Sequence, residues 1–148
     1  MRVMIFSLLT FLFGEYGSQK SKKLEYIDKS YEEEIKTVQL YPDTGNPQDV
    51  FDSPAVAIDR NTLVLEFDDL VESHEDYRVM LIHCNADWTA SKLKPLDYLK
   101  TYNEFIINQF EYSVDTKIGY VHYTFKVPKV IVSGNYLIVA YRGANTKD

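Results

Sequence analysis

The chain has 148 residues, which is enough for one domain with a single hydrophobic core. Hydrophobic residues make up 45% of the sequence and charged residues 26%, the balance of a globular rather than a disordered protein. The formal net charge of −6 argues against non-specific binding to nucleic acid and against electrostatic docking on anionic lipid, because both need a basic surface. The single cysteine, Cys84, excludes an intrachain disulfide and is interpreted as a small buried apolar residue, with a reactive thiol as the alternative.

The first 18 residues have the pattern of a secretory signal peptide. Arg2 precedes an apolar run at residues 3–13, and small residues follow the run. The run is too short to cross a bilayer of ~30 Å as a helix, and its alternative interpretation is a buried N-terminal strand or helix. We therefore expect a signal peptide over residues 1–18, export, no membrane span in the mature chain, and a charged leader over residues 19–34.

Residues 35–143 predict an all-β domain with about seven short strands separated by turns. The strands are expected at residues 35–41, 55–58 (weakly), 62–67, 77–84, 105–112, 119–127 and 136–142, with one helical turn at residues 96–99. In the last strand, alternation places Leu137, Val139 and Tyr141 on the inward face. This pattern favours an immunoglobulin-like β-sandwich, with a closed barrel as the alternative and residues 144–148 as a tail or truncation point.

Several side chains could carry chemistry, but their arrangement predicts no enzyme, metal or cofactor. His83 and Cys84 are neighbours on a predicted strand, so their side chains point to opposite faces and form no catalytic pair, although His122 could approach either one across the sheet. His83, Cys84 and Asp87 offer three zinc ligands without a second cluster to complete a site. The carboxylates of Asp68 and Asp69 are expected at a strand end, as solvated turn residues.

The string His83-Cys84-Asn85-Ala86-Asp87-Trp88 is the most specific motif in the sequence. It leaves an apolar strand that is predicted to be buried, where Asn85 and Asp87 can shape the exit turn by bonding nearby backbone amides. Trp88 is expected to fold back on the core, where its indole N–H needs a partner. We interpret the motif as architectural.

At this motif the chain resembles the N-terminal domain of the type IX secretion system plug proteins of Bacteroidota. The resemblance covers about residues 30–143, and its segments follow the family's order. They are Ile35-Lys36-Thr37-Val38-Gln39-Leu40-Tyr41, Leu65-Glu66-Phe67-Asp68-Asp69-Leu70, Leu81-Ile82-His83-Cys84-Asn85-Ala86-Asp87-Trp88, Leu96-Asp97-Tyr98-Leu99, His122-Tyr123 and Ser133-Gly134-Asn135-Tyr136-Leu137.

The resemblance implies a non-enzymatic periplasmic protein, associated with the inner side of the outer membrane. Its partner would be a very large outer-membrane β-barrel translocon, whose pore it closes when no cargo is exported. Family members are considerably longer than this chain. The matched residues look like fold determinants rather than contact residues: His83, Cys84, Asn85, Asp87, Trp88, Asp68, Asp69, Gly134, Asn135 and Tyr136.

Two other classes of function remain open at this point. A glycan- or ligand-binding sandwich would carry a shallow groove lined by exposed aromatic rings, drawn from Tyr16, Tyr98, Tyr102, Tyr112 and Tyr120. An enzyme would bring His83, Cys84 and His122 together in a concave site. The resemblance to the plug proteins implies neither a small-molecule substrate nor nucleic acid as a partner.

Overall fold

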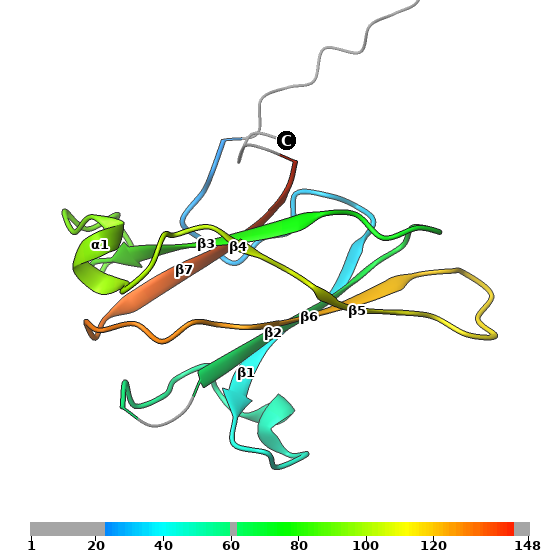
Figure 1. The fold of residues 1–148 in the computed structure, drawn as a ribbon, viewed down its shortest axis with the longest axis horizontal. Coiled ribbons are helices and arrows are strands. Elements are labelled where there is room, and N and C mark those ends of the chain that lie inside the picture. Colours follow the sequence, from blue (N-terminus) through cyan, green and yellow to red (C-terminus); the bar gives the residue numbers. More distant parts are fainter. Residues whose placement is uncertain (1–22, 60–61, 144–148) are drawn as a thin grey trace, which may run out of the picture.

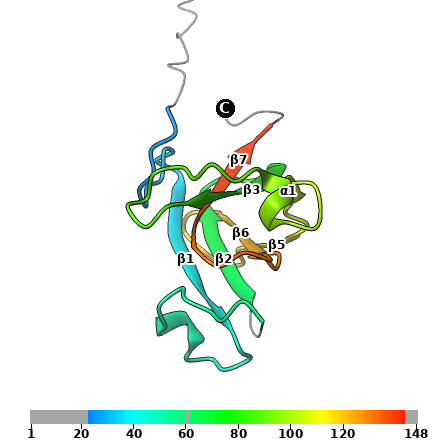
Figure 2. The same cartoon turned by 90° about the vertical axis from the view of Figure 1, so that its left-hand side faces the viewer.

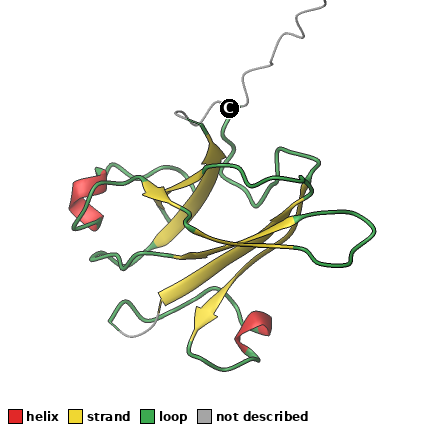
Figure 3. Cartoon of the chain, turned by 45° about the vertical axis from the view of Figure 1, so that its right-hand side comes forward, coloured by secondary structure: helices red, strands yellow, loops and turns green. Residues whose placement is uncertain are grey.

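Two antiparallel β-sheets face each other in the computed structural model, which describes residues 23–59 and 62–143 (Figures 1 and 3). One sheet has the order β1-β2-β6-β5 and the other β4-β3-β7. The strands are β1 (Ile35–Asp43), β2 (Thr62–Asp69), β3 (Tyr77–Cys84), β4 (Phe105–Ile106), β5 (Gln109–Tyr112), β6 (Val121–Lys126) and β7 (Asn135–Arg142). This confirms the predicted all-β sandwich of seven strands. The predicted signal peptide and the tail at residues 144–148 lie outside the described residues.

Helical structure in the described ranges is confined to two short turns at the periphery of the sandwich. The 3-10 turn η1 (Asp49–Phe51) lies in the long connection after β1, which projects beyond one end of the β1-β2 pair (Figure 2). The helical turn α1 (Pro95–Tyr98) forms close to the predicted position, and the Tyr98 hydroxyl donates a 2.8 Å hydrogen bond to the carbonyl of Leu81 in β3. This contact anchors the segment after β3 to the sandwich.

The core lies between the inner faces of the two sheets. On β3, Val79 and Leu81 are buried, and on β6, Val121 and Tyr123 are buried, which matches the predicted alternation on residues 119–127. Phe67 of β2 packs against the ring of Tyr123 with the centroids 5.1 Å apart. Large apolar side chains that alternate along each strand therefore meet across the interior, as in other sandwiches.

Two predicted strands differ from those observed in more than their bounds. The expected strand at residues 105–112 is two strands of different sheets, because β4 pairs with β3 whereas β5 pairs with β6. The weak strand expected at residues 55–58 is wrong, since this segment is an irregular connection. β1 also continues through Pro42 to Asp43, two residues beyond its predicted end.

The inward orientation predicted for Leu137 and Val139 in the last strand is wrong, whereas Tyr141, predicted on the same face, is buried with 7% of its surface exposed. Tyr136 and Ile138 pack against the core, and their register partners on β3 are His83 and Leu81. Leu137 and Val139 therefore lie on the outer face. Alternation could not decide the orientation because both faces of β7 are apolar over most of its length.

Candidate functional site

The motif after β3 forms a compact turn held by its own polar side chains. The Asp87 carboxylate accepts hydrogen bonds from the Thr89 backbone N–H at 3.1 Å and from its hydroxyl at 2.6 Å. The Asn85 side chain donates a 2.9 Å hydrogen bond to the Thr89 hydroxyl. The backbone carbonyl of Asn85 accepts a 3.3 Å hydrogen bond from the side-chain amide of Asn135. The Thr89 hydroxyl and N–H lower the pKa of Asp87. The expected turn-forming role of Asn85 and Asp87 agrees with these contacts.

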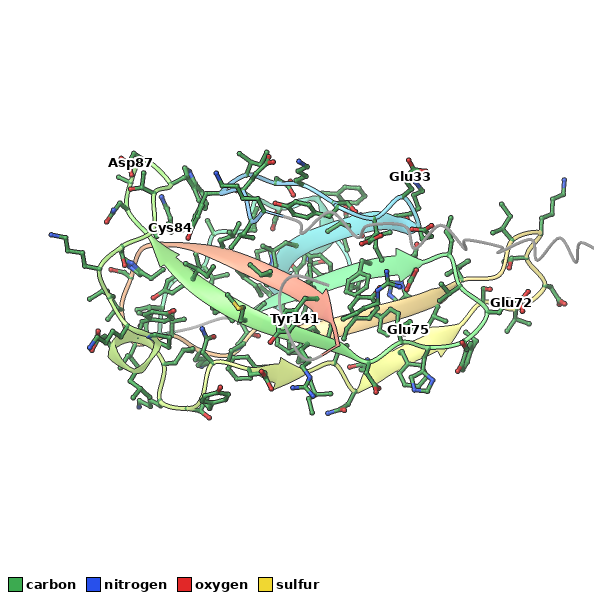
Figure 4. The ribbon with its side chains drawn as sticks, turned by 90° about the horizontal axis from the view of Figure 1, so that it is seen from above. Glu33, Glu72, Glu75, Cys84, Asp87 and Tyr141 are labelled. Carbon is green, nitrogen blue, oxygen red and sulfur yellow. The ribbon has the colours of Figure 1, made fainter. Side chains whose placement is uncertain are left out.

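Trp88 does not fold back on the core. Trp88 is 47% exposed, and its backbone has a positive φ of 62° within the turn. Cys84 is buried with 2% of its surface exposed, and burial raises the pKa of its thiol. Figure 4 shows Asp87 beyond Cys84 at one end of the β3-β7 pair, far from Tyr141 at the other end.

His83 is fixed on the inner face between two tyrosine rings and a glycine. Its ring lies edge-on to Tyr136 with the centroids 5.0 Å apart, and it is tilted against Tyr98. A Cβ on Gly134 would overlap Nε2 of His83, and the φ of Gly134 is 155°. The three motif residues His83, Gly134 and Tyr136 therefore meet, and they act as a packing unit.

The predicted carboxylate pair lies within β2 rather than in a solvated turn. Asp68 points outward, where its Oδ1 lies 2.8 Å from Nδ1 of His122 on β6. Asp69 points inward, has no exposed surface, and accepts a 2.8 Å hydrogen bond from the Tyr77 hydroxyl. The expectation that solvent surrounds both carboxylates is wrong for Asp69, because β2 extends two residues further than predicted.

These positions do not assemble a catalytic centre from the described residues. His83 lies on the inner face of one sheet, His122 lies on the outer face of the other, and Cys84 is buried at the end of β3. Within residues 23–59 and 62–143, no group of three His, Cys, Asp or Glu side chains could hold a metal ion. The convergence that an enzyme requires is therefore not met by His83, Cys84 and His122.

The predicted aromatic groove is also not formed by its proposed residues. Tyr98 is buried, whereas Tyr102 and Tyr112 are 76% and 51% exposed. In the described part of the chain, neither of these two exposed rings, nor Tyr120, lines the cavities of about 820 and 610 Å³. Tyr16 lies outside the described residues.

A concave surface lies on the side of the sandwich where β1 and β7 are the neighbouring edges, which we call the open side. Two cavities of about 820 and 610 Å³ lie along it, and they share five lining residues. The shared residues are Leu40, Pro54, Trp88, Tyr136 and Ile138. The open side was not identified from the sequence, although the apolar, uncharged stretch of β7 was a signal that could have indicated it.

The leader segment at residues 24–32 forms one wall of the larger cavity. Glu32 of this segment forms an ion pair with Arg142 at the end of β7, with an N–O distance of 3.8 Å. Ile27 of the same segment is 56% exposed. The leader therefore flanks the open side and leaves apolar surface accessible to a partner.

Comparisons with known proteins agree with this fold. A family model described as "Type 9 secretion system plug protein 1st domain" matches residues 35–148. A solved structure of a hypothetical protein from Parabacteroides merdae ATCC 43184 is 31% identical and superimposes with a TM-score of 0.69. The similarity covers 75% of this chain and 28% of the Parabacteroides chain, so this chain spans a minor part of that relative. No curated protein matches the sequence significantly.

Proposed function

The chain belongs to the type 9 secretion system plug protein family through its first domain, and on this premise we propose that it binds the outer-membrane translocon barrel of that system from the periplasm and helps to keep the pore closed. The observation that carries the proposal is the family match over residues 35–148, which includes every strand of the sandwich. Export through a signal peptide at residues 1–18 is part of the same proposal.

The geometry of the described residues supports binding rather than catalysis. The titratable side chains of the sequence motif are used for packing and turn formation, as at His83 and Asp87. The larger cavity on the open side is lined mostly by apolar residues, with a few charged residues from the leader and the end of β7. An apolar surface of this kind is typical of protein–protein recognition. Within the described ranges, no helix is long and apolar enough to cross a membrane.

Co-purification from a host that carries the type 9 secretion system tests the proposal. The full chain, tagged at its C-terminus, is expressed in that host, and proteins that co-purify from the periplasmic and outer-membrane fractions are identified by mass spectrometry. We expect the large barrel protein to co-purify. N-terminal sequencing of the recovered chain tests cleavage near residue 18.

The matched control is Leu81→Asp, which places a charge in the core at a residue with 1% exposure and disrupts the fold. The barrel should be absent from this control. If the folded chain does not recover the barrel under conditions where a longer family member does, the proposed binding is wrong.

A further inference from the structure

The interior of the sandwich is accessible from the open side. Ala140 of β7 is paired with Val79 of β3, so both side chains belong to the inner face of their sheet. Val79 has no exposed surface, whereas Ala140 is exposed. On the facing edge, Val38 of β1 is 50% exposed and lines the larger cavity together with Ala140. The two sheets therefore leave apolar inner surface uncovered between β1 and β7.

Three of the four sheet edges carry features that discourage pairing with another strand. β1 has a register shift between Lys36 and Gln39, and it contains Thr37 with a φ of 52° and Pro42, which has no backbone N–H. β4 has two residues and β5 has four, so both edges are short. Natural sheets use such devices to block association through their edges.

The edge of β7 has none of these features. It runs for eight residues in continuous register with β3, and the stretch Tyr136 to Tyr141 contains no charged residue, proline or glycine. Within residues 23–59 and 62–143, β3 is the only strand that pairs with it. The outer edge of β7 therefore presents a row of backbone hydrogen-bonding groups beside an apolar cavity.

The leader segment does not occupy this edge. Residues 24–32 line the larger cavity together with β7, and Glu32 forms an ion pair with Arg142 at the end of the strand. Leaving Glu32 aside, no residue of the leader has a backbone hydrogen bond to β7 in the described part of the chain. We call the larger cavity, between leader residues 24–32 and the free edge of β7, the trough.

We propose that the trough binds an extended, uncharged segment of the translocon protein, which adds as a strand to the free edge of β7. This inference rests on the proposed function and specifies its contact surface. An extended segment fits this edge, because its backbone can form hydrogen bonds with the unpaired N–H and C=O groups of β7, as in other cases of strand addition. Because successive side chains of a strand point to opposite faces, alternate residues of the added segment would contact the apolar lining at Val38, Leu40 and Ile138, and we expect them to be bulky and apolar.

The length and charge of the ligand follow from the same features. β7 offers eight residues, so a segment of similar length spans about 26 Å at ~3.3 Å per residue. The charged residues of the lining are Asp28, Lys29 and Glu32 of the leader and Arg142 at the end of β7. A charged side chain in the middle of the segment would instead face the uncharged stretch of β7, where burial of a charge without a partner is unfavourable. A second copy of this chain is the competing occupant of the trough.

Site-specific photo-crosslinking in cells that carry the secretion system tests the contact. Benzoylphenylalanine is placed at Ala140 or Val38 in the trough, and at Ile106 on the opposite edge of the same sheet as the matched control. Ala140, Val38 and Ile106 are all exposed, so each position accepts the bulky group. We expect cross-links from Ala140 and Val38 to an uncharged segment of the barrel protein, mapped by mass spectrometry, and none from Ile106.

The outcomes separate this inference from the proposed function. If the barrel cross-links at Ile106 and not at Ala140 or Val38, the trough is not the contact and the proposed function stands. If no position captures the barrel, and the chain does not co-purify with it, the proposed function itself fails. A cross-link from Ala140 to a second copy of the chain would overturn strand donation by the barrel and indicate a dimer.

Binding measurements provide a second test that does not depend on the cross-linker. Ala140→Arg introduces a charge into the trough and should weaken binding to the purified barrel by about tenfold or more, whereas Ile106→Arg should leave it unchanged. Thermal unfolding of both variants checks that they are folded. Amide hydrogen exchange should show the backbone N–H groups on the outer edge of β7 becoming protected in the complex. Unchanged exchange on β7 in a formed complex would contradict the proposal.

Discussion

The Tyr77 hydroxyl of β3 donates a 2.8 Å hydrogen bond to Oδ2 of Asp69 on β2 and thereby links the two sheets through the core. Asp69 has no exposed surface, and its Oδ1 has no hydrogen-bond partner among the described residues. Tyr77 is 4% exposed, and its pKa is raised by burial and by the carboxylate that it contacts. Among the described residues, the Tyr77 hydroxyl is thus the only hydrogen-bond donor to the buried carboxylate of Asp69.

Tyr77→Phe should destabilise the protein by about 1–3 kcal/mol, because it leaves a buried acceptor without its donor while keeping the ring. The edge contacts of the ring with Phe67 and Tyr123, at centroid distances of 5.0 and 4.9 Å, are retained in this variant. The free energy of unfolding from urea titration measures the effect. Tyr102→Phe, at a ring that is 76% exposed, is the matched control and should change the stability little.

The double variant Asp69→Leu with Tyr77→Phe distinguishes the hydrogen bond from general packing. Removing both polar partners leaves no unsatisfied group, so this variant should be more stable than Tyr77→Phe alone. Equal stability of the Tyr77→Phe and Tyr102→Phe variants would contradict the role given to this hydrogen bond.

Gly134→Ala should destabilise the domain for two separate reasons. A Cβ at this position would overlap the His83 ring, and the φ of 155° is unfavourable for any residue with a side chain. We expect a loss of about 1–3 kcal/mol in the free energy of unfolding. Gly119→Ala is the matched control, since no atom lies within 4 Å of its added Cβ.

Adding His83→Ala to Gly134→Ala separates the two causes. If overlap with the ring dominates, this double variant costs less than the sum of the two single changes; if backbone strain dominates, the effects add. A Gly134→Ala variant as stable as Gly119→Ala would show that neither cause operates.

The strand pattern could be predicted from the sequence because alternation is strong where one face is buried. Residues 119–127 show this clearly, with Val121 and Tyr123 inward and His122 outward. The same rule failed for β7, where Leu137 and Ile138 are both apolar and the pattern has no preferred orientation. Which sheet a strand joins is decided by long-range pairing, so the division of residues 105–112 between two sheets left no local signal.

The candidate site was less predictable than the fold. The turn role of Asn85 and Asp87 follows from local chemistry and agrees with the observed contacts. The exposure of Trp88 depends on the direction in which the turn leaves the sheet, and residue type does not encode this direction. The open side arises where the leader and β1, which are adjacent in the sequence, meet β7, which lies about a hundred residues further along the chain.

Alkaline pH should destabilise the protein through Tyr136. Burial raises the pKa of this phenol from about 10 to about 12, and its hydroxyl donates to the Val132 carbonyl at 2.6 Å. Because the pKa is higher in the folded state, the neutral form favours folding: the contribution is fully present below about pH 10 and is lost as the pH rises towards about 12. Urea titrations across this range should show the free energy of unfolding falling.

Tyr136→Phe should make that decline less steep, because the variant has no proton to lose at this position. It also lacks the bond to Val132, so its stability should be lower than that of the natural chain at neutral pH. Parallel pH profiles for the two proteins would contradict the assignment of the alkaline transition to Tyr136.

Cys84 should react with thiol reagents only when the domain opens. It is the only cysteine in the sequence, its side chain is 2% exposed, and burial raises the pKa of its thiol, so both access and the thiolate fraction are low. We expect slow modification by an aromatic disulfide reagent in buffer and rapid modification in urea. The rate in buffer should rise in Tyr77→Phe, since a less stable domain opens more often. Fast modification of the native chain, at a rate independent of stability, would show instead that this thiol is accessible and would reopen the possibility of nucleophilic chemistry at the end of β3.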